Sequence, residues 1–139
     1  MKNYNHLTVV FFKAAGSAKD DPVLTFQQCT AVDESDIKNL ATIDKYWKKE
    51  GAALTAIGTF TLVEQTASQT VTLSATSAES QGIYVFEIDG TDLDTENSFD
   101  CVKVTVADTG AAGAQLGAML YILSEPRYAG STLPSAIVD

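Results

Sequence analysis

The chain has 139 residues, of which 45% are hydrophobic and 19% charged, the size and balance of one globular domain. Its nine lysines and arginines are outnumbered by eighteen aspartates and glutamates, so the net charge is −9 with the single histidine neutral. A surface this acidic repels phosphate backbones and anionic lipid headgroups, which disfavours nucleic acid and membrane as partners. We also expect no membrane span or secretory signal, because the apolar run Leu7–Phe12 is too short for either.

Short runs rich in valine, isoleucine, threonine and aromatic residues recur along the chain, a pattern typical of strands. The predicted strands are Thr8–Phe12, Val23–Cys29, Thr59–Glu64, Thr70–Ser74, Ile83–Ile88 and Cys101–Val106. The predicted breaks between them are Gly16–Asp21, Ala67–Ser68, Ser77–Gly82 and Asp108–Gly113. Short strands separated by frequent turns favour an all-β fold, an antiparallel β-sandwich or barrel.

Two further segments need a separate interpretation. Asp33–Glu50 starts with acidic residues and ends with lysines, as a helix would, but its apolar residues fit helical spacing no better than strand alternation. We interpret it as a loop up to about Lys38, followed by a strand through Lys48. Leu116–Leu123 has no polar residue except Tyr121, so we expect a central strand that is buried on both faces.

The C-terminal segment Glu125–Asp139 contains two prolines and a glycine and shows no clear period. Leu133, Ile137 and Val138 make it too apolar for a simple solvated tail. We therefore divide the chain into a β-sandwich domain, residues 1–125, and an extended C-terminal arm, residues 126–139. The arm packs either on a neighbouring subunit or back on its own domain.

The sequence carries no catalytic or metal-binding motif. His6 is the single histidine, and nothing fixes the geometry of a dyad with Ser68 or Cys29, so His6 is interpreted as a surface or strand-edge residue. No G-x-S-x-G, H-E-x-x-H or C-x-x-C motif occurs, and the glycines Gly110, Gly113 and Gly117 do not have the spacing of a nucleotide-binding loop. We predict a protein that is not an enzyme and has no catalytic residue, cofactor or resident metal.

Three features have both a structural and a functional interpretation. The acidic segment Asp89–Asp100 offers oxygen ligands for calcium, but it has no EF-hand spacing, and a solvated loop is the favoured interpretation. Trp47 beside Tyr46 would form a platform for a sugar ring, although a tryptophan in a small sandwich is more often a core residue. Cys29 and Cys101 lie in separate apolar segments and are expected to stay reduced.

The second half of the chain resembles a known class of proteins, the head decoration or cement proteins of tailed bacteriophages, which are small virion proteins encoded near the capsid gene. The segments that carry the resemblance are Gly82–Asp89, Leu93–Asp94, Phe99–Val104, Val106–Asp108, Ala114–Gly117, Leu120–Ala129 and Leu133–Ile137. A looser resemblance covers Tyr46–Lys49 and Gly51–Leu54. The class has no catalytic signature, so no residue-level site is carried over from it.

The resemblance implies a β-rich protein that is made in the host bacterial cytoplasm and located on the capsid surface of the virion. It would bind the assembled major capsid protein and itself, as a homo-oligomer; a trimer would match the local three-fold axes of the shell. The candidate partner-binding residues are Arg127, Tyr128, Leu133, Pro134, Ile137 and Val138. Two alternatives stay open: a phage tail, collar or fibre-anchoring component, and a carbohydrate-binding β-sandwich module that uses Trp47 and a calcium-loaded acidic loop.

Overall fold

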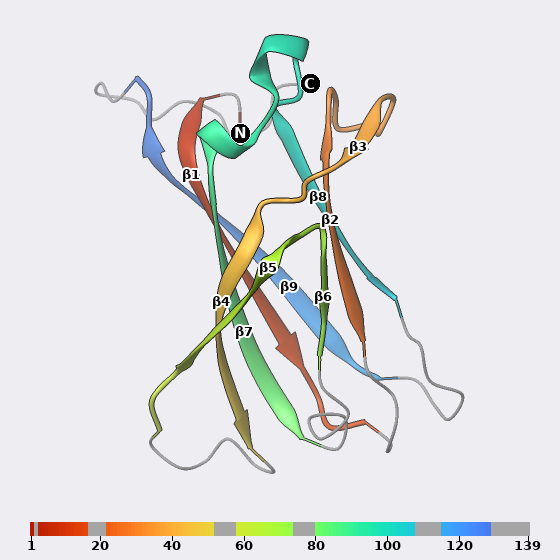
Figure 1. The fold of residues 1–139 in the computed structure, drawn as a ribbon, viewed down its shortest axis with the longest axis vertical. Coiled ribbons are helices and arrows are strands. Elements are labelled where there is room, and N and C mark those ends of the chain that lie inside the picture. Colours follow the sequence, from red (N-terminus) through yellow and green to blue (C-terminus); the bar gives the residue numbers. More distant parts are fainter. Residues whose placement is uncertain (2, 17–21, 52–57, 74–79, 108–114, 129–139) are drawn as a thin grey trace.

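Strands dominate the computed structural model, which describes residues 1, 3–16, 22–51, 58–73, 80–107 and 115–128 (Figure 1). The strands are β1 (Tyr4–Lys13), β2 (Val23–Cys29), β3 (Ile37–Asn39), β4 (Ile43–Gly51), β5 (Thr61–Ser68), β6 (Thr70–Thr72), β7 (Gln81–Asp89), β8 (Cys101–Ala107) and β9 (Gly117–Pro126). Two 3₁₀ turns, η2 (Gly90–Asp92) and η3 (Thr95–Asn97), lie between β7 and β8. Within the described ranges, no helix has the length and apolar character needed to cross a membrane.

The strands form two antiparallel sheets that pack face to face, which confirms the predicted all-β sandwich. Sheet A has five strands in the order β5-β4-β7-β1-β9. Sheet B is built around β2, which pairs along its whole length with β8 and, on its other edge, with the short strands β3 and β6. In the described part of the chain, β9 is therefore an edge of sheet A and β8 an edge of sheet B. Of the predicted C-terminal arm, residues 129–139 lie outside the described residues.

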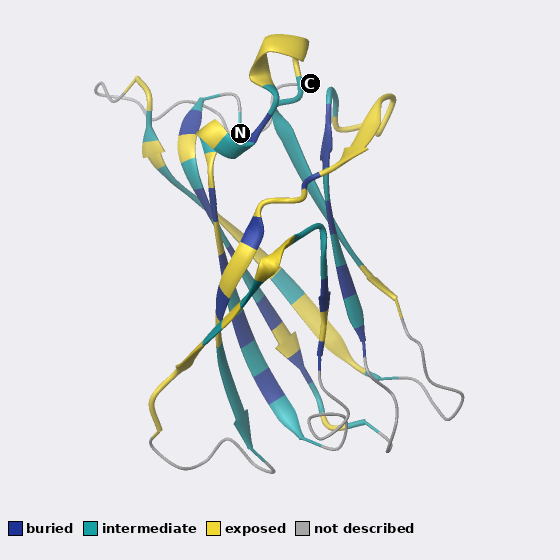
Figure 2. Cartoon of the chain, viewed as in Figure 1, coloured by how far each residue is buried: buried dark blue, intermediate teal, exposed yellow. Residues whose placement is uncertain are grey.

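The core lies between the sheets and is filled by alternate residues of β1, β2 and β7 (Figure 2). Because side chains alternate between the two faces of a strand, every second residue of these strands points inward. The buried side chains are Leu7, Val9 and Phe11 from β1, Leu24 and Phe26 from β2, and Tyr84, Phe86 and Ile88 from β7. The Phe86 ring lies 4.9 Å from the Phe26 ring and 5.3 Å from the Tyr46 ring, measured between centroids, and so joins the two sheets.

Most predicted strands are present, with corrected ends. Val23–Cys29 is confirmed residue for residue, and Thr8–Phe12, Ile83–Ile88 and Cys101–Val106 each lie inside a longer strand. The break predicted at Ser77–Gly82 is wrong at its end, because β7 already begins at Gln81. Residues 74–79, together with 17–21 and 108–114 of two other predicted breaks, lie outside the described residues.

The predictions around β3, β4 and β5 need larger corrections. The predicted strand Thr59–Glu64 starts two residues later, at Thr61, and continues through the break predicted at Ala67–Ser68. The chain turns at Gln69 instead. There the Ser68 hydroxyl accepts a hydrogen bond from the backbone N–H of Thr70, the residue that follows the turn. In the segment predicted as a loop and then a strand, β3 forms from Ile37, inside the predicted loop, and β4 follows after a short turn.

Gly82 makes room for the buried ring of Tyr84, whose hydroxyl donates a 2.6 Å hydrogen bond to Glu50 Oε1. A Cβ atom on Gly82 would lie 2.6 Å from Tyr84 Cε2 and under 3 Å from Cζ and the hydroxyl oxygen. Burial acts to raise the pKa of Glu50, but the hydrogen bonds from Tyr84 and Lys48 outweigh it, and the pKa lies below its ordinary value. Any side chain at Gly82 therefore displaces the ring that holds this carboxylate.

The substitution Gly82→Ala is expected to lower the free energy of unfolding by about 1–3 kcal/mol, since it overpacks the ring and weakens the Tyr84–Glu50 bond. Equilibrium unfolding in urea measures the loss. Gly58→Ala is the matched control, because a Cβ there approaches only the flexible end of the Lys49 side chain, at 3.6 Å. A loss at Gly82 no greater than at Gly58 would contradict the close approach.

Cys29 and Cys101 face each other across β2 and β8, and both are free thiols in the structure. The Phe26 N–H donates to the Gln69 carbonyl, and the Phe26 carbonyl accepts from the Leu40 N–H, so both groups point away from β8. Phe26 and the residue opposite it on β8 are therefore a non-hydrogen-bonded pair. Alternation along the ladder then makes the two cysteines a hydrogen-bonded pair, the class in which opposite Cβ atoms lie farther apart, toward about 5.5 Å. The Cβ atoms of an unstrained disulfide lie only about 3.5–4.5 Å apart, so bridging this pair would strain the two strands.

We therefore expect thiol titration of the unfolded protein to find two free groups. Burial raises the pKa of both thiols, which keeps the reactive thiolate scarce. The same count is expected after the folded protein has been incubated with oxidised glutathione. A titration that finds no thiol, in a chain that stays monomeric, would mean that the strands are bridged.

Candidate interaction surface

One apolar residue from each strand of sheet A lies on the outer face of that sheet, in register across its whole width. Residues directly opposite each other on antiparallel strands share a face, so the pairings connect them into one line. From β5 to β9 this line, here called the apolar row, consists of Leu62, Trp47, Val85, Val10 and Leu120. Leu62 is 39% exposed, Trp47 43% and Leu120 51%, and the two valines are half-buried.

The residues beside the apolar row are apolar at its β1 and β9 end and charged at its β4 end. Phe12 and Ile122, 41% and 45% exposed, extend the apolar surface over β1 and β9. Along β4, Lys45 and Lys49 lie on either side of Trp47 on the same face. A contiguous apolar patch with a polar border is the usual sign of an interaction surface on a soluble protein.

The apolar row overturns two expectations from the sequence. Leu116–Leu123 was predicted to be a central strand, but β9 is an edge strand in which only the inner face, with Met119 and Leu123, packs on the core. Trp47 was predicted to be a core residue, but its neighbour Tyr46 takes the inward position and is 8% exposed. In both cases the residue types are those of a buried surface, and within the subunit nothing among the described residues buries them.

His6 connects three strands at one end of the same face. Its Nδ1 lies 2.9 Å from the Ser124 hydroxyl oxygen, its Nε2 lies 2.8 Å from Glu87 Oε2, and Thr8 donates to the same carboxylate oxygen at 2.9 Å. A serine, a histidine and a carboxylate are the components of a hydrolytic triad, but catalysis also needs oxyanion donors and a substrate pocket. The trio lies on the outer face of sheet A, and the groove described below is lined by other residues. Its contacts connect β7, β1 and β9.

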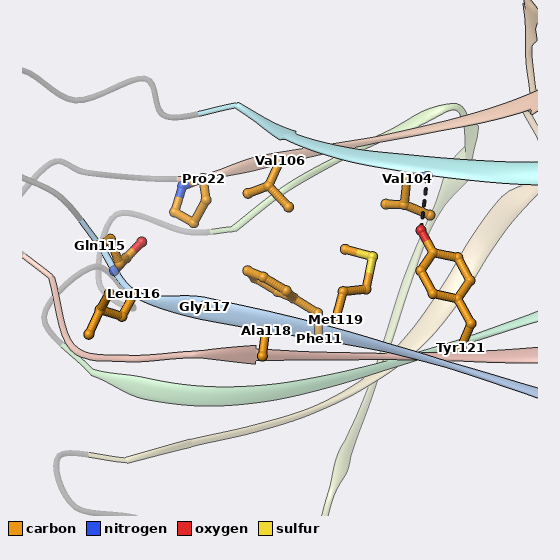
Figure 3. Close-up of a pocket in the computed structure, with 10 residues that line it drawn as sticks. All are labelled: Phe11, Pro22, Val104, Val106, Gln115, Leu116, Gly117, Ala118, Met119 and Tyr121. Atoms are coloured by element: carbon orange, nitrogen blue, oxygen red, sulfur yellow. Dashed lines mark hydrogen bonds between the residues drawn. The ribbon is translucent and has the colours of Figure 1, made fainter. Parts of the chain in front are cut away.

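A groove of about 490 Å³ lies between the edge strands β8 and β9 (Figure 3). None of its lining residues is charged: Phe11, Pro22, Val104, Val106, Gln115, Leu116, Gly117, Ala118, Met119 and Tyr121. Val106 is 43% exposed and Leu116 77%, so part of this apolar lining faces solvent. The groove is a second surface on which apolar side chains lack a partner among the described residues.

Hydrogen bonds are present at both ends of the groove. At one end the backbone N–H of Val104 donates to the Tyr121 hydroxyl at 3.2 Å and so bridges the two sheet edges, and burial raises the pKa of Tyr121. At the other end Gln115 Nε2 donates to the Ala14 carbonyl at 3.1 Å, and the Ala14 N–H donates to the Leu116 carbonyl at 2.9 Å, which ties the β9 wall to the end of β1. The first bond connects the two walls, and the other two anchor the β9 wall to its own sheet.

The candidate partner-binding residues predicted from the sequence fall mostly outside the described residues. Residues 129–139 lie outside the described residues, and they include four of the six candidates: Leu133, Pro134, Ile137 and Val138. Of the other two, Arg127 is tied to the start of β1: its Nε donates to Asn5 Oδ1 at 2.8 Å and its N–H to the Asn3 carbonyl at 2.9 Å. Tyr128 is 75% exposed. The apolar row and the groove were not predicted, because their residues come from strands that are distant in sequence.

Two carboxylates of the acidic loop, those of Asp92 and Asp94, interact with protein groups. Asp92 accepts the N–H of Asp89 at 3.0 Å, and Asp94 pairs with Lys38 and accepts from Asn97. The hydrogen bonds from Lys38 and Asn97 hold the pKa of Asp94 below its usual value. Among the described residues, no three carboxylate, histidine or cysteine side chains are grouped as metal ligands.

Comparisons with protein-family models, curated proteins and solved structures give no match. The apolar row and the uncharged groove are the two surfaces on which the described residues leave apolar side chains exposed.

Proposed function

We propose that the protein is a virion structural protein that binds the outside of an assembled phage capsid and stabilises it as a decoration, or cement, protein. The observation that carries the proposal is the apolar row, which crosses all five strands of sheet A. Small-molecule sites are concave, whereas a row of this kind on the face of a sheet suits a broad macromolecular surface. The proposed partner is the major capsid protein, and the proposed place is the capsid surface.

The remaining features support a structural role without enzyme activity. The chain carries a charge of −9, which favours partners whose exposed surface is less acidic and keeps the free protein soluble. The described residues present an interaction face, and the groove between β8 and β9 is lined by residues other than the histidine-centred trio. The resemblance of the second half of the chain to decoration proteins points in the same direction. Synthesis in the bacterial cytoplasm, followed by addition to the shell, completes the proposal.

The test is co-sedimentation of the purified protein with capsids, assembled without it, of the phage that encodes the chain. We expect saturable binding to the expanded shell and a rise in the temperature at which the shell disassembles. Electron microscopy of the complexes should show density repeated over the head. Density at one vertex or along the tail would instead support a tail, collar or fibre-anchoring component, and binding to glycans but not to capsids would support a carbohydrate module.

A further inference from the structure

We infer that the groove between β8 and β9 is the docking site for residues 129–139 of a second copy of this chain. The inference goes beyond the proposed function, because self-association through the arm does not depend on what the apolar row binds. It assigns one occupant to the groove and makes the contact between copies head-to-tail, since the arm and the groove are different surfaces. Repetition of such a contact closes a ring or extends a chain of copies.

The chemistry of the groove matches the chemistry of the arm. The groove is lined by apolar and uncharged residues, and the proposed occupant, residues 129–139, has no charged side chain before Asp139. Two copies that each carry a charge of −9 repel each other over most of their surfaces. An uncharged segment in an uncharged groove is a contact that avoids this repulsion. Leu133, Ile137 and Val138 would supply the apolar side chains that fill it.

The walls of the groove are strand edges to which an extended segment can be added. Because Ala14 donates to the carbonyl of Leu116, alternation directs the backbone groups of Gly117, Met119 and Tyr121 away from β1, toward the free edge of β9. Addition of a strand to such an edge gives affinity through main-chain hydrogen bonds and specificity through pockets for alternate side chains. In the arm, Pro134 lacks an N–H, but an added strand needs the N–H of every second residue only.

The reach of the arm favours the groove of a second copy. The groove lies at the start of β9, and the arm leaves from the other end of that strand, about 30 Å away for a ten-residue strand. Arg127 is tied to the start of β1, which fixes the point of departure at this end of the sheet. Residues 129–139 span at most roughly 40 Å, so to reach their own groove they would need a nearly fully extended path back along the sandwich. Docking on a second copy does not impose this path.

The decisive experiment is cross-linking between two variants that each contain a single cysteine. Both carry Cys29→Ser and Cys101→Ser; one has Leu116→Cys and the other Ile137→Cys. One of the two bears a size tag, so that a mixed dimer is recognised on a gel after mild oxidation. We expect mixed dimers in about tenfold excess over a control in which Asp44→Cys, exposed on β4, replaces Leu116→Cys. A Leu116→Cys, Ile137→Cys double variant that closes on itself without dimers, or equal yields in test and control, would overturn the inference.

A second measurement leaves the native cysteines in place. Analytical ultracentrifugation of the full chain compares Leu116→Glu in the groove and Leu133→Glu in the arm with Val32→Glu, a loop residue that is 72% exposed. We expect both test variants to weaken self-association about tenfold or more, and the control to associate like the parent. Unchanged association in either test variant contradicts the inference. Capsid co-sedimentation of the same variants tests the proposed function separately.

Discussion

Replacing Phe86 with alanine is expected to lower the free energy of unfolding by about 3–5 kcal/mol. The Phe86 side chain is fully buried, and its ring packs against rings from both sheets, Phe26 of sheet B and Tyr46 of sheet A. Truncation removes these contacts and leaves a cavity where the sheets meet, which close-packed neighbours fill only in part. Equilibrium unfolding in guanidinium chloride, followed by circular dichroism, measures the loss.

The control for Phe86 is the next residue along the same strand, Val85, which lies on the outer face of sheet A. Val85→Ala removes apolar atoms from a half-buried position in the apolar row, so it is expected to cost under about 1 kcal/mol in the free protein. The ratio of the two losses thus tests which face of β7 is the core. Equal losses would contradict the assignment of the inner face to the core, and a larger loss at Val85 would mean that the two faces have been assigned the wrong way round.

Much of the fold could be predicted from local patterns. Val23–Cys29 was predicted residue for residue from its strand-forming residue types and from Pro22, which precedes it. Ile83–Ile88 was found from its residue types and Cys101–Val106 also from its two-residue alternation, since both signals are properties of each strand alone. The ends of strands were less well predicted, because a turn such as that at Gln69 depends on a single side chain to backbone hydrogen bond.

The candidate surface could not be predicted, for two physical reasons. The apolar row takes one residue from each of five strands, and its existence depends on strand order and register, which are long-range properties of the chain. The apolar character of Trp47 and of Leu116–Leu123 was recognised, but burial in a core and burial against another molecule select the same residue types. The sequence therefore indicated that these side chains are buried against something, and only the fold shows that the described part of the subunit leaves them exposed.

Placing a charge in the apolar row is expected to abolish most shell binding while leaving the fold intact. Trp47→Glu and Leu120→Glu each introduce a carboxylate at an exposed position of the outer face, so neither disturbs the inter-sheet core. Substitution of a central aromatic anchor in an interface commonly costs about 2 kcal/mol or more, which is roughly a 30-fold loss of affinity. Capsid co-sedimentation over a range of protein concentrations measures the loss, and urea unfolding confirms the fold.

Val32→Glu is the matched control for these two variants, since it makes the same change of charge at an apolar residue that is 72% exposed and lies outside the row. It is expected to bind the shell like the parent, which separates an effect of position from the effect of one more negative charge on a chain at −9. Normal shell binding by both row variants would remove the row as the capsid surface. If Leu116→Glu alone then lost binding, the groove would be the surface that meets the shell. Because the row and the groove lie on different surfaces of the sandwich, the three substitutions assign the shell contact to one of them.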